Sequence, residues 1–303
     1  MTSDIHLRIR EKAARITDPA GRELAVLEDP SALEISALCG PDLHEIYREA
    51  LGIGVYPGRY VRNLDVISPT EQLKLAEAQV AVAGAGGLGG QVILLLARIG
   101  VGRLVVVDHD RFDETNLNRQ ALCSRETLNR PKAEAAVEVV ASVNPGVRVI
   151  PHRTKIGASN AESLLAGADV IVDALDNVPD RLVLQERARR LGVPLVHGAL
   201  AGFEGRVMTI YPGDPGLEQL YEPAAAEADP ERPEALLGVP AVTAAVVGSL
   251  QAMEVLKILL HRGKPFRQIM AHIDLESGRF EEFRFDGTGE GGLPHRESKP
   301  PLT

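Results

Sequence analysis

The sequence predicts an α/β fold built on a doubly wound, mostly parallel sheet, with helices on both faces and a strand hairpin near its C-terminal end. Short segments that are apolar throughout, rather than at every second residue, recur between residues 79 and 211, and segments of helical length separate them. Such strands are buried on both faces, which is typical of a parallel sheet covered by helices on both sides. The alternation of the two kinds of segment predicts the α/β class.

The individual segments follow one another in a regular order. Pro131 stands near the start of one helical segment and Asn144-Pro145 follows its end, as expected at helix boundaries. Further on, Glu276-Ser277-Gly278 separates two strand-like segments and predicts a hairpin. The predicted strands are 79–83, 103–107, 147–151, 170–174, 194–197, 206–211, 268–274 and 279–285, and the predicted helices are 88–99, 131–143, 180–191 and 241–260.

Composition changes along the chain predict its domain organisation. Residues 1–55 are acidic and helix-like and end in a Gly/Pro-rich stretch, so we expect an N-terminal helical appendage to a domain of residues 59–286. Residues 212–240 contain six prolines and several acidic residues, which predicts a mobile surface loop. The tail, 287–303, is rich in Gly, Pro and charge, and we expect it to be disordered.

The overall composition argues against several classes of function. The 303 residues carry a net charge of −9, so no general affinity for nucleic acid or for an anionic membrane is expected. The N-terminus is charged and amphipathic, unlike a signal sequence, and apolar stretches such as 241–250 are too short to span a bilayer. Cys39 and Cys123 give no disulfide framework, and we expect a cytoplasmic protein.

A glycine-rich loop follows the first predicted strand and opens a helix. Its sequence is Gly84-Ala85-Gly86-Gly87-Leu88-Gly89. Glycines allow the backbone to turn tightly and to approach a phosphate, whose charge suits the amides at a helix N-terminus. Asp108, at the end of the second predicted strand, stands where an acid would bind ribose hydroxyls in a Rossmann-like domain. These features alone fit an NAD-dependent oxidoreductase equally well.

The polar residues beyond Asp108 favour a nucleoside triphosphate instead. They include an amide, a guanidinium and an ammonium group, which a nicotinamide enzyme does not need at this position. A triphosphate does need them, because its several charges must be oriented and spread. The candidate residues in this run are Asp110, Asn116, Arg119, Gln120 and Lys132.

A second polar pair, Asp176-Asn177, lies just beyond another predicted buried strand. Ligands of open α/β sheets bind in the crevice at the carboxyl ends of the strands, so we expect this pair in the same site. Asp176 is therefore a candidate Mg²⁺ ligand, directly or through water.

With these motifs, the sequence resembles the ThiF/MoeB/HesA adenylyltransferases, which are relatives of ubiquitin-activating enzymes. The resemblance covers about residues 59 to 285 and leaves residues 1–55 outside. Its matching segments are Arg59-Tyr60-Val61-Arg62-Asn63, the glycine loop, the run from Asp108 to Gln120, Pro131-Lys132, Asp176-Asn177 with Arg181, His197-Gly198-Ala199, Glu204-Gly205 and the segment from Gly248 to Glu254.

The resemblance implies a role for each candidate residue. Gly84, Gly86 and Gly87 would lie against the nucleotide, Asp108 would hold its ribose, and Asp176 would manage Mg²⁺ near the α-phosphate. Arg62 would reach the triphosphate from the other subunit of a homodimer. The implied catalytic residues are Arg62, Arg119, Lys132 and Asp176, and the implied nucleotide-binding residues are Gly84, Gly86, Gly87, Asp108, Asp110, Asn116, Gln120 and Asn177.

The sequence also departs from the family. Many members bind zinc through two Cys-x-x-Cys pairs, but this chain contains no such pair, so we expect no zinc site. No cysteine follows Cys123, where thioester-forming members keep theirs. We therefore expect no covalent thioester. Arg181 is interpreted as a structural partner of a nearby acid rather than a site residue.

Four functions remain open at this stage. The first is ATP- and Mg²⁺-dependent adenylation of the C-terminal carboxylate of a small ubiquitin-like sulfur-carrier protein, which gives an acyl-adenylate and pyrophosphate. The second is the same reaction on a peptide or a small-molecule carboxylate. A catalytically inactive scaffold and an NAD-dependent oxidoreductase are the other two. The identity of the acyl substrate does not follow from the sequence.

Overall fold

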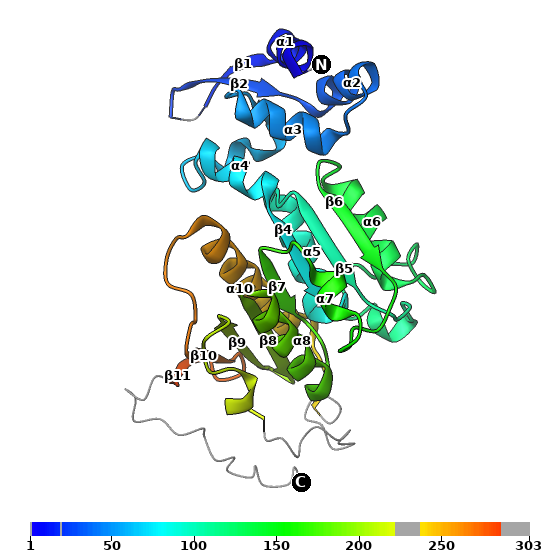
Figure 1. Cartoon of the computed structure of the whole chain (residues 1–303), viewed down its shortest axis with the longest axis vertical. Helices are drawn as coiled ribbons and strands as arrows, with labels where there is room; N and C mark the ends of the chain where they lie inside the picture. Colours follow the sequence, from blue (N-terminus) through cyan, green and yellow to red (C-terminus); the bar gives the residue numbers. More distant parts are fainter. Residues whose placement is uncertain (1, 19, 222–236, 286–303) are drawn as a thin grey trace.

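The computed structural model describes residues 2–18, 20–221 and 237–285, and an eight-stranded sheet forms its centre. The strand order is β11-β10-β9-β8-β7-β4-β5-β6 (Figure 1). The five strands from β8 to β6 run parallel, and β9, β10 and β11 are antiparallel to their neighbours. The predicted fold class is confirmed. The strands are β4 (Gln79–Ala83), β5 (Arg103–Val107), β6 (Arg148–His152), β7 (Val170–Asp173), β8 (Leu195–Ala201), β9 (Glu204–Ile210), β10 (Ile269–Asp274) and β11 (Arg279–Arg284).

Helices cover both faces of the sheet, because nearly all residues of the central strands β4, β5 and β7 are apolar and successive side chains point to opposite faces. Val80 and Val82 of β4 lie in one core, and Ala81 and Ala83 lie in the other. The first core includes residues of α4 (Pro69–Glu77), α5 (Gly87–Ile99), α6 (Lys132–Val143) and α10 (Ala241–Leu260), and the second includes residues of α7 (Ala161–Leu165) and α8 (Val178–Leu191).

Helix α10 is long and apolar enough to cross a membrane by length and composition alone. From the sequence, only residues 241–250 of this helix were considered as a membrane-spanning candidate, and the whole helix of 20 residues is twice as long. Half of its residues are buried within the protein, and it packs on α5, β8 and β9. Its apolar composition is accounted for by this core position on one face of the sheet.

The N-terminal appendage has a small core of its own and a mixed structure. It contains α1 (Thr2–Lys12), β1 (Ala14–Thr17), β2 (Glu23–Leu27), α2 (Asp29–Cys39), α3 (Leu43–Gly52) and the short strand β3 (Tyr56–Pro57). The prediction of a helical appendage was wrong for residues 14–27, where β1 and β2 pair as an antiparallel hairpin. The Asp18 side chain accepts hydrogen bonds from the backbone N–H groups of Ala20 and Arg22, and Gly21 takes a φ of +80°. This local turn chemistry overrides the helical tendency of the flanking residues.

The appendage packs against the turn between α6 and β6. The Tyr47 ring of α3 lies on Gly146, where a Cβ would overlap it, and Tyr47 Oη donates to Asp29 Oδ1 at 2.5 Å. Arg59 pairs with the same carboxylate and donates through Nη1 to Val143 O at 2.9 Å. The appendage and the main domain are thereby joined by the packing of Tyr47 on Gly146 and by partly buried hydrogen bonds of Arg59.

Two predicted regions lie largely beyond the described residues. The tail 287–303 is outside them, as is 222–236 of the predicted mobile loop 212–240. Of this loop, residues 217–219 form the 3-10 helix η3 (Leu217–Gln219), whose first backbone N–H donates to Gln185 Oε1 at 2.6 Å.

The contact between Tyr47 and Gly146 predicts a stability effect. Gly146→Ala would force a methyl group into the packed Tyr47 ring, and we expect a loss of about 1–3 kcal/mol in the free energy of unfolding. Gly157→Ala is the matched control, because a Cβ there meets no atom within 4 Å, and it should change stability by less than about 0.5 kcal/mol. Urea unfolding measures both. Equal stability of the two variants would contradict the described packing.

Candidate nucleotide-binding site

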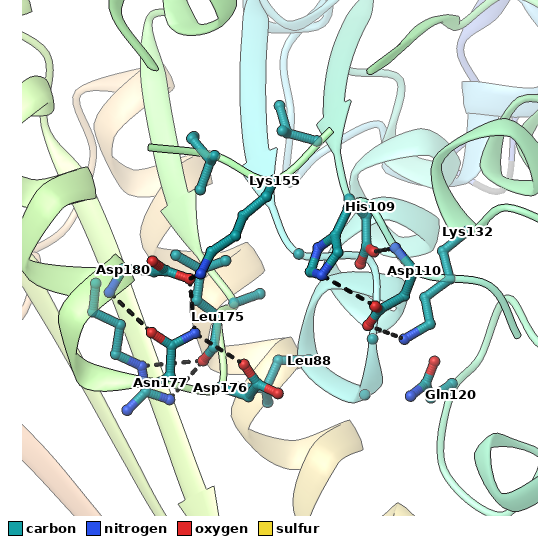
Figure 2. A pocket seen from close by; sticks show the side chains of 18 of the residues that line it. Leu88, His109, Asp110, Gln120, Lys132, Lys155, Leu175, Asp176, Asn177 and Asp180 are labelled. Atoms are coloured by element: carbon teal, nitrogen blue, oxygen red, sulfur yellow. Dashed lines mark hydrogen bonds and ion pairs between the residues drawn. The ribbon is translucent and has the colours of Figure 1, made fainter. Parts of the chain in front are cut away.

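A pocket lined by many of the predicted residues lies where the strand order reverses direction. The chain runs from β4 through β5 to β6 and then returns to place β7 on the other side of β4. Ligands of open α/β sheets bind at this point, beyond the carboxyl ends of the strands. The pocket brings together ten of the predicted site residues (Figure 2), namely Gly84, Gly86, Gly87, Asp108, Asp110, Arg119, Gln120, Lys132, Asp176 and Asn177.

The glycine loop lines the pocket through Gly84, Gly86 and Gly87. Gly84 has a φ of +94°, and a Cβ there would lie 2.5 Å from Ala174 O. Only glycine fits this close approach of two backbones. Helix α5 then begins at Gly87 without a side-chain cap at its N-terminus. Its first amides are therefore available to an anion, which the positive end of the helix also favours.

Asp108 ties the loop to the end of the neighbouring strand. Its Oδ2 accepts from the Ala85 backbone N–H at 2.7 Å, and its Oδ1 accepts from the Asp110 backbone N–H at 2.8 Å. The residue is 9% exposed and lines the pocket. Because each carboxylate oxygen accepts more than one hydrogen bond, Asp108 can shape the loop and still bind a hydroxyl group.

Lys132 is a buried cation at the start of a helix. It is the first residue of α6, its side chain is 8% exposed, and its Nζ lies 3.2 Å from Asp110 Oδ2. A buried cation at the positive end of a helix is unfavourable by itself, because the helix dipole opposes it. A bound phosphate would offset both the cost of burying the Lys132 cation and its repulsion by the positive end of the helix. The position of Lys132 in the pocket thus indicates an anion site at its ammonium group.

Two further predicted residues lie near the glycine loop. Gln120 is 6% exposed, and its Oε1 has no hydrogen-bond partner in the described part of the chain. A buried amide oxygen of this kind calls for a donor, which a nucleotide hydroxyl or amino group would supply. Arg119 extends along Gly87, with its Cγ 3.8 Å from where a Cβ of Gly87 would stand. Its Nη1 donates to Thr115 O at 3.0 Å.

On the other wall, Asn177 is committed to helix α8. Its Oδ1 accepts from the Asp180 backbone N–H at 2.9 Å as the N-cap, and its Nδ2 donates to Asp180 Oδ2 at 2.9 Å. Asp176 precedes it, with an exposed side chain that faces the pocket (Figure 2). The structure therefore places both residues at the site and gives Asn177 a structural role as well.

Two predicted residues do not line the pocket. Asn116 is buried, and its Oδ1 accepts from the Asp113 backbone N–H at 3.2 Å, so its side chain holds a turn. Arg62 lies in the 3-10 helix η1 (Gly58–Asn63) with an exposed side chain. The spacing of Asp113 and Asn116 is itself a capping signal, and it could have indicated the structural role of Asn116.

Sequence reasoning missed one basic residue of the pocket. Lys155, in the segment after β6, lines the pocket and points toward Asp180, with its Nζ 3.1 Å from Asp180 Oδ2 (Figure 2). No local motif marks this lysine, because the contact joins two segments that only the fold brings together. Arg181 also lines the pocket, but its Nε and Nη2 donate to Leu175 O. These bonds give Arg181 a structural role, as predicted, but through a backbone carbonyl and not through the acid that the prediction named.

Residues 60–290 match the model of the ThiF family. The chain belongs to the ThiF family. Among its relatives, the "SAMP-activating enzyme E1" of Haloferax volcanii is 39% identical over 250 residues, which covers 78% of this chain and 90% of that protein. The "Sulfur carrier protein adenylyltransferase" of Thermus thermophilus is 40% identical over 216 residues, with 68% of this chain and 79% of that protein covered.

Solved structures share the fold of this chain. Escherichia coli MccB, in the crystal structure with MccA-N7isoASN, superposes with a TM-score of 0.64 at 21% identity, over 75% of this chain and 71% of that chain. The structure of PaaA gives a TM-score of 0.63 at 20% identity, over 75% of this chain and 82% of that chain. Together with the sequence relatives, membership of the ThiF family confirms the predicted adenylyltransferase. The oxidoreductase alternative is replaced by this assignment.

The position of Lys132 predicts a loss of nucleotide binding. Charge-assisted hydrogen bonds contribute about 1.5–3 kcal/mol each, so Lys132→Ala should weaken ATP binding or turnover about tenfold or more. Isothermal titration with ATP and Mg²⁺ measures the affinity directly. Lys264→Ala, which removes an exposed lysine that does not line the pocket, is the control and should bind ATP normally. If Lys132→Ala kept its affinity for ATP and its activity, Lys132 would not be a phosphate-binding residue.

Proposed function

We propose that this protein uses ATP and Mg²⁺ to adenylate the C-terminal carboxylate of a small ubiquitin-like sulfur-carrier protein. The observation that carries the proposal is the pocket itself, in which Lys132 at the start of α6 and Asp176 lie on opposite sides (Figure 2) and the glycine loop also lines the cavity. The printed names of two relatives, a SAMP-activating enzyme and a sulfur carrier protein adenylyltransferase, support the substrate class.

The reaction is a substitution at phosphorus. A carboxylate oxygen of the carrier forms a bond to the α-phosphorus of ATP, the bond to the bridging oxygen breaks, and pyrophosphate leaves with its electron pair. The product is an acyl-adenylate. Such a reaction depends mainly on positioning and on stabilising charge, because no proton must be removed from an ionised carboxylate. Lys132 and Arg119 would bind the phosphates, while Asp108 would hold the ribose.

The acidic side chains of the pocket fit a magnesium ion. Mg²⁺ prefers carboxylate and water oxygens, and when bound it neutralises charge on the phosphates. Asp176 would hold the ion, directly or through water. Asp110 lies on the opposite wall of the pocket (Figure 2). Asp108, His109 and Asp110 also place ligand atoms within 4.8 Å of one another. Both oxygens of Asp108 are already engaged by backbone N–H groups, which makes Asp108 the weaker candidate.

The two cysteines support release of the adenylate without a covalent thioester. No cysteine follows Cys123 in the sequence. Burial and the nearby Asp113 carboxylate raise the pKa of the Cys123 thiol, which disfavours the nucleophilic thiolate. Cys39 lies in the appendage, at the end of α2.

Adenylation of a peptide or of a small-molecule carboxylate would use the same pocket and is the second candidate function.

ATP–pyrophosphate exchange tests the proposed reaction. We expect exchange to require a ubiquitin-like carrier with an intact C-terminal carboxylate and to be lost when that carboxylate is amidated. The Cys39→Ala/Cys123→Ala double variant should keep the exchange rate to within about twofold, since neither thiol has a place in the reaction. A conjugate of enzyme and carrier that reducing agent cleaves, and that this variant loses, would contradict the absence of a thioester.

The environment of Arg62 supports an active homodimer. Its neighbours in the same motif have partners within the chain. Arg59 binds Asp29, Tyr60 Oη accepts from Asn144 Nδ2, and Asn63 Nδ2 donates to Gln72 Oε1. Arg62 has an exposed side chain and no such bond to the described residues.

Exposed apolar side chains of Leu117, Val242 and Met253 offer surface for a second copy.

Mixing two inactive variants tests whether Arg62 acts across the dimer. Arg62→Ala and Lys132→Ala homodimers should each be nearly inactive. After subunit exchange, about half of the dimers are mixed and hold one intact site, so about a quarter of the wild-type activity should return. Native mass spectrometry verifies the exchange. Absence of recovery despite verified exchange would place Arg62 outside the partner's site.

We also propose a cytoplasmic location. Cys39 and Cys123 are free thiols in the structure, which suits a reducing compartment.

A further inference from the structure

A buried histidine–aspartate pair lies directly behind the pocket wall formed by residues 174–177, which we call the 174–177 segment. We propose that His197 is a positioning residue of the adenylation site and acts through Asp173 to orient this segment and thus Asp176. The inference rests on the proposed function, because it assumes that Asp176 acts on the nucleotide.

Asp173 connects the pair to the segment. Its Oδ1 accepts from the Leu175 backbone N–H at 3.1 Å, and its Oδ2 lies 2.7 Å from His197 Nδ1. Both Asp173 and His197 are 0% exposed. A carboxylate at this depth is tolerated only when its oxygens are satisfied, so the imidazole is what allows Asp173 to hold Leu175.

His197 is suited to this role in its neutral form. Complete burial lowers the pKa of its imidazole, against the opposing effect of Asp173. A neutral ring that donates from Nδ1 to Asp173 leaves Nε2 as an acceptor, and Nε2 has no partner among the described residues. The ring meets Tyr221 edge-on, with the ring centroids 6.3 Å apart.

A second connection holds the other backbone group of Leu175. Arg181 donates to Leu175 O from Nε at 3.1 Å and from Nη2 at 2.6 Å. The same guanidinium donates from Nη1 to Tyr221 Oη at 3.0 Å. Leu175 therefore has its N–H fixed by Asp173 and its C=O fixed by Arg181, and the two connections meet at Tyr221. The residue that follows this doubly held position is Asp176.

Helix α10 holds the pair from a third side. Gln251 Nε2 donates to Asp173 O at 2.8 Å and to Val196 O at 3.3 Å. Its amide lies against Gly198, where a Cβ would overlap it. The glycine after His197 thus admits Gln251 and keeps the ends of β7 and β8 at a fixed separation.

The matched substitutions separate the hydrogen bond from simple packing. His197→Leu fills a similar volume and leaves Asp173 buried without its partner, whereas His197→Asn keeps an amide donor near the position of Nδ1. Misplacement of a catalytic group by about 1 Å can cost about 100-fold in rate. We expect His197→Leu to lower kcat for ATP–pyrophosphate exchange at least about tenfold, with the KM for ATP changed less than about threefold, and His197→Asn to restore most of kcat.

A double-variant comparison shows whether the effect passes through Asp176. In the Asp176→Asn background, His197→Leu should cause no further loss of kcat, because the group that it positions is already removed. If the double variant instead lost kcat by the product of the two single-variant factors, His197→Leu would act by general disruption. That result would overturn the inference and leave the proposed function standing. An unaltered exchange rate in Asp176→Asn alone would overturn the role of Asp176 and the inference together.

Tyr221→Phe provides a second route if His197→Leu does not fold. Tyr221 is only partly buried, and the change removes just the hydroxyl that accepts from Arg181. We expect a several-fold loss of kcat that disappears in the Asp176→Asn background. Tyr211→Phe, at another partly buried tyrosine outside the nucleotide pocket, is the control and should leave exchange unchanged. Wild-type kcat in Tyr221→Phe would contradict the positioning network.

Discussion

The carboxylate of Asp108 is the constraint on which the nucleotide site depends. One oxygen fixes the backbone of Ala85 in the glycine loop, and the other fixes the backbone of Asp110. The Lys132 backbone N–H in turn donates to Asp110 O at 2.9 Å, so the start of α6 is placed by the same turn. A single buried acid thereby sets the loop, the turn and the cationic helix end in one arrangement. Its removal would disturb all three as well as any contact to ribose.

The opposite wall is built on a similar plan, with side chains that hold backbone groups beside the ligand pocket. Asn177 caps α8, and Asp173 and Arg181 hold the N–H and C=O groups of Leu175. Irregular segments between strands and helices cannot satisfy their own backbone groups, so buried side chains must do so. This arrangement fixes the backbone of the pocket walls without lengthening any helix or strand, and it leaves the Asp176 side chain directed toward the pocket.

Most of the fold and much of the site follow from the sequence, because both depend on local patterns. Apolar runs gave the parallel strands, and the glycine loop with Asp108 located the pocket. The hairpin of residues 14–27 was missed, although Asp18-Pro19-Ala20-Gly21 is a recognisable turn sequence. Contacts such as Lys155 with Asp180 and His197 with Asp173 join segments distant in sequence, so no local pattern indicates them. Capping side chains such as Asn116 resemble ligand-binding ones in sequence, since both present an amide.

The pairing of β4 with β7 has a consequence for how the protein reaches its active form. The Gln79 backbone N–H donates to Asp169, 90 residues further along the chain, and the pocket opens at the other end of these two strands. Closing so long a loop is entropically costly and slow compared with forming the helices and the neighbouring β4–β5 pair. A chain emerging from the ribosome therefore has its glycine loop long before it has the second wall. Nucleotide affinity is therefore expected only after β7 has joined the sheet, and ATP would then stabilise molecules in which both walls of the pocket have formed.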